Sequence, residues 1–214
     1  RDMGTAVAEA QKKVNAAIHL PEGYFLKWTG DFENQQRASK RLAQVVPVSI
    51  AIIFVILFVL FSNARDAGLV LLNVPFAAVG GIAALLLTGF NFSISAGIGF
   101  IALFGICIQN GVIIISDIKH NLHTRLSLPD AVKTGMRSRI RSIVMTAAMA
   151  AIGLMPAAMS HGIGSESQRP LAIVIIGGLI GATFFALFVF PLIVEWVYSK
   201  MLYDKEGNLL QRKL

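Results

Sequence analysis

The chain has 214 residues, of which 55% are hydrophobic and only 14% are charged, and its mean hydropathy is +0.68. Soluble domains have about 25% charged residues, so this composition excludes an ordinary soluble domain and predicts an integral membrane protein. The net charge of +7 does not indicate a nucleic-acid partner, because the basic residues concentrate in the connections between apolar runs.

The first 42 residues have the character of a water-soluble segment. Residues 5–18 place apolar side chains at helical spacing, residues 24–29 alternate as in a strand, and residues 31–42 form a polar, helix-prone stretch. One helix and one strand cannot form a core, so residues 1–42 are expected to be the end of a larger domain followed by a linker helix. Residue 1 is Arg rather than Met, so the chain is expected to begin inside a longer protein.

Four uncharged runs are expected to supply five membrane-spanning helices. A helix needs about 20 apolar residues to cross a bilayer core, and the run at 67–116 is long enough for two spans with a turn between them. The predicted five-helix domain covers residues 43–198 and is followed by a tail at 199–214. Its spans are expected at about 43–61, 67–87, 93–116, 143–160 and 171–194.

The positions of Lys and Arg predict how these spans are oriented. The connection after the first span, the connection at 117–142 and the tail together carry eleven basic residues, whereas the two opposite connections carry only Arg169. Because positively charged loops stay in the cytoplasm, the tail is expected to be cytoplasmic and residues 1–42 to lie on the other side of the membrane.

The segment from Ser93 to Asp117 is expected to be the central helix of the bundle. Gln109 and Asn110 place two amide groups in the middle of this otherwise apolar span, and polar side chains at that depth face a bundle interior or a wet path. The alternative interpretation is that the two amides only hold neighbouring helices together. Small residues would let surrounding helices approach closely. These residues are Gly97, Gly99, Gly105 and Gly111.

Acidic side chains are absent from the five predicted spans, with Asp117 and Glu195 expected at span ends. A proton-coupled carrier needs an intramembrane ionisable group, so either the protein is not such a carrier or the group lies in spans outside this chain. No nucleophile–base pair or phosphate loop is present, so no enzyme activity is expected.

The sequence contains only weak candidates for metal ligands. Two i, i+4 pairs of methionine on the fourth span would suit a soft ion such as Cu(I), although methionine more commonly fills gaps in packing. These methionines are Met145, Met149, Met155 and Met159. His120 and His123 form an i, i+3 pair without a third ligand nearby, and Cys107 is expected to pack as a small apolar residue.

Four motifs carry a resemblance to a known family. They are GDFENQQRA at 30–38, FIALFGICIQNGVIIIS at 100–116, RSIVMTA at 141–147 and GSESQRPLA at 164–172. In this order they resemble the heavy-metal efflux branch of the resistance-nodulation-division (RND) superfamily. The resemblance covers about residues 1–200, which is nearly the whole chain.

The resemblance implies an all-α membrane fold. Members are homotrimeric pumps of the bacterial inner membrane with twelve spans and two large periplasmic loops. This chain looks like the end of the second loop, a short α/β remnant of the periplasmic porter domain, followed by spans eight to twelve. Its implied partners are the rest of the same polypeptide, a periplasmic adaptor, an outer-membrane channel and the lipid bilayer, and no nucleic acid. The N-terminal segment would be periplasmic.

The resemblance also implies a function for particular residues. Gln109 stands where multidrug relatives have a lysine that faces an aspartate pair in the fourth span, and Asn110 matches the asparagine beside it. Arg139 and Thr146 match an arginine and a threonine that help proton coupling. The implied function is proton-driven export of heavy-metal cations without a resident cofactor, a transporter rather than an enzyme. The alternatives are a pump for organic molecules and a non-transporting membrane subunit.

One further motif bears on the choice of metal. Residues 168–170 read Gln-Arg-Pro and look like those of the divalent-cation pumps, whereas copper and silver relatives tend to have a methionine at or near Gln168. The resemblance therefore favours Zn, Co, Cd or Ni over Cu or Ag as the transported cation.

Overall fold

The computed structural model describes residues 3–17, 31–124, 126–162 and 164–202. These described residues are almost entirely helical, without a strand among them. The strand expected at 24–29 lies outside them, so the α/β character of the N-terminal segment stays a prediction. The chain divides into two compact units, Arg1–Ile50 and Ala51–Leu214.

The first unit contains α1 (Met3–Ala17) and the beginning of α2 (Asp31–Phe61). Exposed i, i+4 ion pairs stabilise these polar helical segments: Lys13 with Glu9 on α1, and Arg37 with Glu33 on α2. The helix α2 continues without a break from its polar beginning to its apolar end, so the polar stretch at 31–42 and the first apolar segment belong to one helix.

The second span is broken into α3 (Ala64–Leu71) and α4 (Asn73–Thr88). Pro75 explains the break, because it has no N–H to donate to the carbonyl of Leu71, four residues earlier. Beside the break, the side chain of Asn73 donates from Nδ2 to the carbonyl of Val70 at 3.0 Å.

The third and fourth spans are longer than the sequence predicts. The helix α5 covers Ile94–His123 and α6 covers Leu128–Met159, so most of the expected connection at 117–142 is helical. Ser127 starts α6 by accepting a hydrogen bond from the backbone N–H of Asp130, as an N-cap does. No proline interrupts the charged turns that follow, so the helix continues directly into the span.

The last span consists of α7 (Ser165–Phe184), a wide π-helical turn η1 (Phe185–Val189) and α8 (Phe190–Leu202). Pro191 lies two residues after the wide turn and cannot donate to the carbonyl of Leu187 within that turn, which favours such a local widening of the helix.

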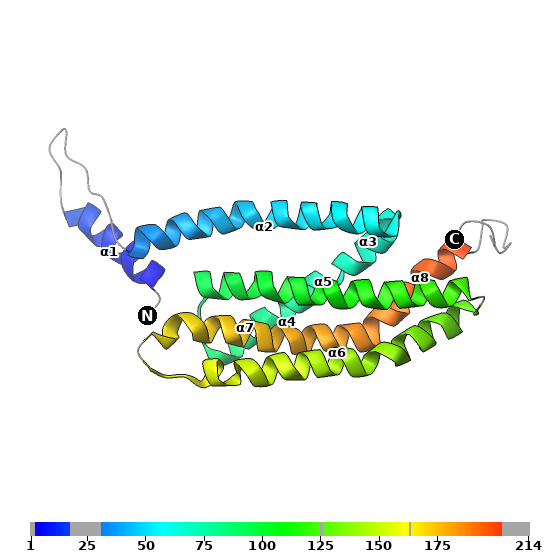
Figure 1. The fold of residues 1–214 in the computed structure, drawn as a ribbon. Coiled ribbons are helices and arrows are strands. Elements are labelled where there is room, and N and C mark those ends of the chain that lie inside the picture. Colours follow the sequence, from blue (N-terminus) through cyan, green and yellow to red (C-terminus); the bar gives the residue numbers. More distant parts are fainter. Residues whose placement is uncertain (1–2, 18–30, 125, 163, 203–214) are drawn as a thin grey trace. The chain divides into compact units, whose positions relative to one another are not determined.

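Five helical segments are long and apolar enough to cross a membrane, as the sequence predicts. In the second unit α5, α6 and α7 run alongside one another (Figure 1). Of the five segments, the one formed by α7 and α8 is the most enclosed, rather than the segment expected to be central. The five are Lys40–Phe61, Ala64–Thr88, Ile94–His123, Leu128–Met159 and Ser167–Lys200.

Glycines bring the backbones of α4 and α7 into close contact. A Cβ atom added at Gly177 would lie 2.2 Å from the Cβ of Ala84, and one added at Gly80 would lie 2.7 Å from the carbonyl oxygen of Gly177. Gly181 packs against Gly80 in the same way. The small-residue spacing of Gly177 and Gly181 therefore marks a real close approach between helices.

The glycines of α5 divide into two groups. Gly99 packs against Leu171 of α7, and Gly111 packs against Val70 and the side chain of Asn73, whereas nothing lies within 4 Å of a Cβ added at Gly105. Within this chain α5 is therefore enclosed on one side and open on the other.

Candidate functional site: a polar seam between α5 and α6

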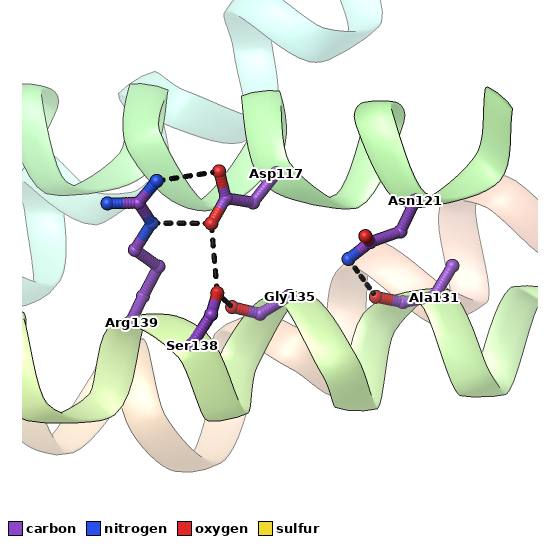
Figure 2. Close-up of polar contacts among 6 residues, drawn as sticks. All are labelled: Asp117, Asn121, Ala131, Gly135, Ser138 and Arg139. Atoms are coloured by element: carbon purple, nitrogen blue, oxygen red, sulfur yellow. Dashed lines mark hydrogen bonds and ion pairs between the residues drawn. The ribbon is translucent and has the colours of Figure 1, made fainter. Parts of the chain in front are cut away.

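An ion pair joins α5 to α6 near the end of α5 (Figure 2). Arg139 of α6 donates from Nη2 to Oδ1 of Asp117 at 2.8 Å and from Nε to Oδ2 of the same carboxylate. Ser138 donates from Oγ to Asp117 Oδ2 at 2.9 Å. Two parallel N–H···O bonds between a guanidinium and a carboxylate fix both distance and orientation, so this pair sets how the two helices face each other.

Two further contacts extend the seam toward the connection between the helices. Asn121 donates from Nδ2 to the carbonyl of Ala131 at 3.3 Å, as Figure 2 shows. Gly135 lies against Ile118, where an added Cβ would come within 3.0 Å of the Ile118 side chain. Residue numbers rise on α5 as they fall on α6, so the two helices are antiparallel with a fixed register.

This register places three of the predicted site residues along one seam. Seven residues make about two helical turns, or about 10 Å along the axis, and return to the same helix face. Asn110 stands seven residues before Asp117, and Thr146 stands seven residues after Arg139. Asn110 and Thr146 therefore lie at a similar depth on the two faces that meet, about two turns from the ion pair.

Gln109 lies beside this seam on a neighbouring face of α5. Its side chain is exposed, while Asn110 and Thr146 are half-buried. Within the part of the chain that the structure describes, none of these three side chains makes a hydrogen bond. The amides therefore do not join two helices of this chain, and their role in proton coupling stays a prediction.

The four candidate methionines all lie on the outer surface of α6. Their exposed fractions are between 50% and 67%, and Ile152 between them is also exposed. Among residues 3–17, 31–124, 126–162 and 164–202, no three His, Cys, Asp or Glu side chains come together. A thioether path along Met145, Met149, Met155 and Met159 would need to be closed by groups from outside this chain, and it stays a prediction.

Arg169, which the sequence singles out in the Gln-Arg-Pro motif, ties the start of α7 to its neighbours. Its Nε donates to the carbonyl of Ala158 at 3.0 Å, and its guanidinium lies 4.9 Å from the ring centroid of Phe90. The contacts are a hydrogen bond to the last turn of α6 and a cation–π interaction. In this chain the residue therefore has a packing role.

The predicted spans carry no acidic side chain, but the helical segments are longer than predicted, and four of the five include one. The only buried one of these lies in the second segment. That segment begins at Ala64 and includes Asp66, which is only 1% exposed. Its partners are Lys119 of α5 and Tyr198 of α8. In the sequence, the spacing of Asp66 and Asn73 indicates that both side chains face the same neighbours, because two residues seven apart lie on one helix face.

Taken together, five long apolar helices, close glycine contacts and charges paired at helix ends define a multi-span helical membrane protein. The chain matches the AcrB/AcrD/AcrF family over residues 1–197 and belongs to that family, which is part of the RND superfamily.

Similar proteins include several heavy-metal resistance proteins. The chain is 42% identical over 200 residues to the cobalt-zinc-cadmium resistance protein CzcA of Cupriavidus metallidurans. The aligned region covers 94% of this chain and 19% of that protein. It is 41% identical to the nickel-cobalt-cadmium resistance protein NccA of Alcaligenes xylosoxydans xylosoxydans, over 99% of this chain and 20% of that one. The crystal structure of a heavy metal efflux pump, crystal form II, superposes with a TM-score of 0.78 at 42% identity and covers 93% of this chain and 20% of that chain. The chain thus spans about one fifth of the length of these relatives.

Proposed function

We propose that the chain is the C-terminal, five-span part of a proton-driven pump that exports heavy-metal cations across the bacterial inner membrane. The observation that carries this proposal is the match over nearly the whole chain to CzcA and NccA, two proteins named for metal resistance, at 41–42% identity. The remaining spans and the periplasmic porter domains would belong to the same polypeptide. The working assembly would be a homotrimer with a periplasmic adaptor and an outer-membrane channel.

The polar seam would supply this part's contribution to proton coupling. A neutral amide such as Gln109 can donate and accept hydrogen bonds but cannot form an ion pair. It would therefore meet the acidic groups of a span outside this chain through hydrogen bonds, with Asn110 and Thr146 lining the same wet path. Arg139 is held by Asp117 at the end of that path, where the bidentate pair fixes its position.

Zn, Co, Cd or Ni are the cations that the proposed pump would export, in preference to Cu or Ag. The names of CzcA and NccA support this choice, because they list cobalt, zinc, cadmium and nickel. The segment 1–42 would lie in the periplasm and the tail in the cytoplasm, as the distribution of basic residues supports.

Metal content of cells tests the proposal. The full-length gene is expressed in a strain without its own metal exporters, and each of Zn, Co, Cd, Ni, Cu and Ag is added singly. We expect a lower cellular content of one or more of the first four metals, measured by mass spectrometry, and an unchanged content of Cu and Ag. Unchanged contents of all six would contradict metal export, and a decrease limited to Cu or Ag would contradict the proposed preference.

A further inference from the structure

A second charged cluster joins four helices on the side of α5 away from the seam. The Asp66 carboxylate of α3 accepts a hydrogen bond from Lys119 Nζ at Oδ2, 3.0 Å away, and another from the Tyr198 hydroxyl at Oδ1, 2.8 Å away. Lys119 also donates to the carbonyl of Phe61 at 3.3 Å, and its ammonium lies 5.5 Å from the centroid of the Phe61 ring. The cluster therefore links α2, α3, α5 and α8.

Burial makes this cluster different from a surface ion pair. The Asp66 side chain is 2% exposed and that of Lys119 is 24% exposed, and Tyr198 is buried. A charge removed from water is tolerated only when it is paired and its remaining hydrogen-bonding positions are satisfied. Both oxygens of Asp66 have a partner, so the cluster is a built junction whose geometry is fixed by three side chains.

The junction and the seam hold α5 from opposite sides. Asp117 and Lys119 are two residues apart, which corresponds to roughly 200° around a helix. Asp117 is bound to α6 through Arg139, while Lys119 is bound to α3 and α8 through Asp66. A helix that is held on two opposite faces cannot turn about its axis without breaking one of the two pairs.

The contact with α3 continues toward the middle of α5. A Cβ atom added at Gly111 would lie 3.1 Å from the side chain of Val70 and 2.9 Å from Nδ2 of Asn73. Asn73 is itself held by its hydrogen bond to the Val70 carbonyl. Gly111 directly follows Asn110, so the same neighbouring helix that pairs with Lys119 also presses on α5 next to the mid-span amides.

We propose that Asp66, together with Lys119 and Tyr198, forms a positioning unit that sets the rotation of α5 and therefore the direction in which Gln109 and Asn110 face. These three residues act on the amides through the helix and do not touch the transported ions. The effect of these three residues on transport rests on the proposed function. Their effect on the rotation of α5 is independent of the proposed function.

Cysteine accessibility in the full-length pump tests the rotation directly. Single cysteines are placed in turn at residues 108, 109, 110 and 112 in a background whose other cysteines, Cys107 included, are replaced by alanine. The labelling rate with a small water-soluble thiol reagent is then measured in membranes. We expect the position of fastest labelling to shift by one or two residues in Asp66→Asn and Lys119→Gln. The controls Asp130→Asn and Lys133→Gln, which alter exposed charges on α6, should leave the labelling pattern unchanged.

Measuring metal export by the substituted pumps distinguishes positioning of α5 from a simple need for balanced charge at Asp66 and Lys119. Each single substitution should lower metal export at equal pump abundance by about 10- to 100-fold, the effect typical of a misplaced functional group, and Tyr198→Phe should have a smaller effect. The double variant Asp66→Asn/Lys119→Gln buries no unpaired charge, so it should restore any lost abundance but keep the shifted labelling and the low export. An unshifted labelling pattern in the single variants, or a double variant with normal export, would overturn the proposal. A shifted pattern with normal export would uphold the positioning of α5 and instead contradict the proposed role of Gln109 and Asn110.

Discussion

Replacing Gln109 by leucine in the full-length pump should abolish proton-coupled metal export while the amount of pump in the membrane stays normal. The Gln109 side chain is exposed and makes no hydrogen bond within the described part of this chain, so its removal costs these five helices little. Interhelical hydrogen bonds in bilayers contribute on average only about 0.6 kcal/mol, so assembly with the rest of the pump should also survive. Metal tolerance of cells and pump abundance on immunoblots measure the two quantities.

Two further substitutions calibrate the Gln109 result. Thr146→Ala should lower export less than Gln109→Leu, because Thr146 offers a single hydroxyl. Ile56→Leu changes an outward-facing apolar side chain, 60% exposed on α2, and should leave export unchanged. Normal export by Gln109→Leu at normal abundance would show that the mid-span amides serve packing alone.

Replacing Gly177 by valine should have the largest effect on stability. Even the Cβ atom would come within 2.2 Å of the Ala84 Cβ, and neither backbone can move away without opening the contact that Gly80 makes with α7. Overpacking of this kind costs about 1–3 kcal/mol or more, which exceeds the few tenths of a kcal/mol that valine gains over glycine in helix propensity. The purified variant should therefore unfold at a lower temperature and reach a lower abundance in the membrane.

Gly68→Val is the matched control for the glycine contact. Gly68 lies exposed on α3 of the same bundle, and nothing stands within 4 Å of its added Cβ, so only the small gain in helix propensity remains. Equal melting temperatures for Gly177→Val and Gly68→Val would show that the close approach of α4 and α7 does not limit stability.

The sequence predicts features of the fold that depend on local runs and spacings. Apolar run lengths predict five spans, and Gly177 and Gly181 have the four-residue spacing of small residues that is typical of close helix contacts. The extent of α6 is missed, because its first turns carry charged side chains that look like a solvated connection. Ser127 caps this helix, which starts at Leu128 and continues through the charged turns into the span without a break.

The sequence does not reveal contacts between residues that are far apart in the chain. Asp66 stands one residue before an uncharged run and is therefore counted as part of a connection. Its burial depends on Lys119, 53 residues later, and on Tyr198, 132 residues later, and no local pattern brings these three together. The pairing of Asp117 with Arg139 is likewise a consequence of the antiparallel register of α5 and α6 rather than of either segment alone.

Proton flux in liposomes tests most directly whether this chain belongs to a proton-coupled metal pump that works through its mid-span amides. The full-length pump and its Gln109→Leu variant are purified and reconstituted at equal density, with a pH-sensitive dye inside the vesicles. A transmembrane pH gradient is imposed and Zn, Co, Cd or Ni is added. We expect the metal to accelerate the collapse of the gradient in vesicles with the unchanged pump and to have no effect in vesicles with Gln109→Leu. A collapse rate that is independent of every metal, or equal metal-dependent rates for the two proteins, would contradict this function.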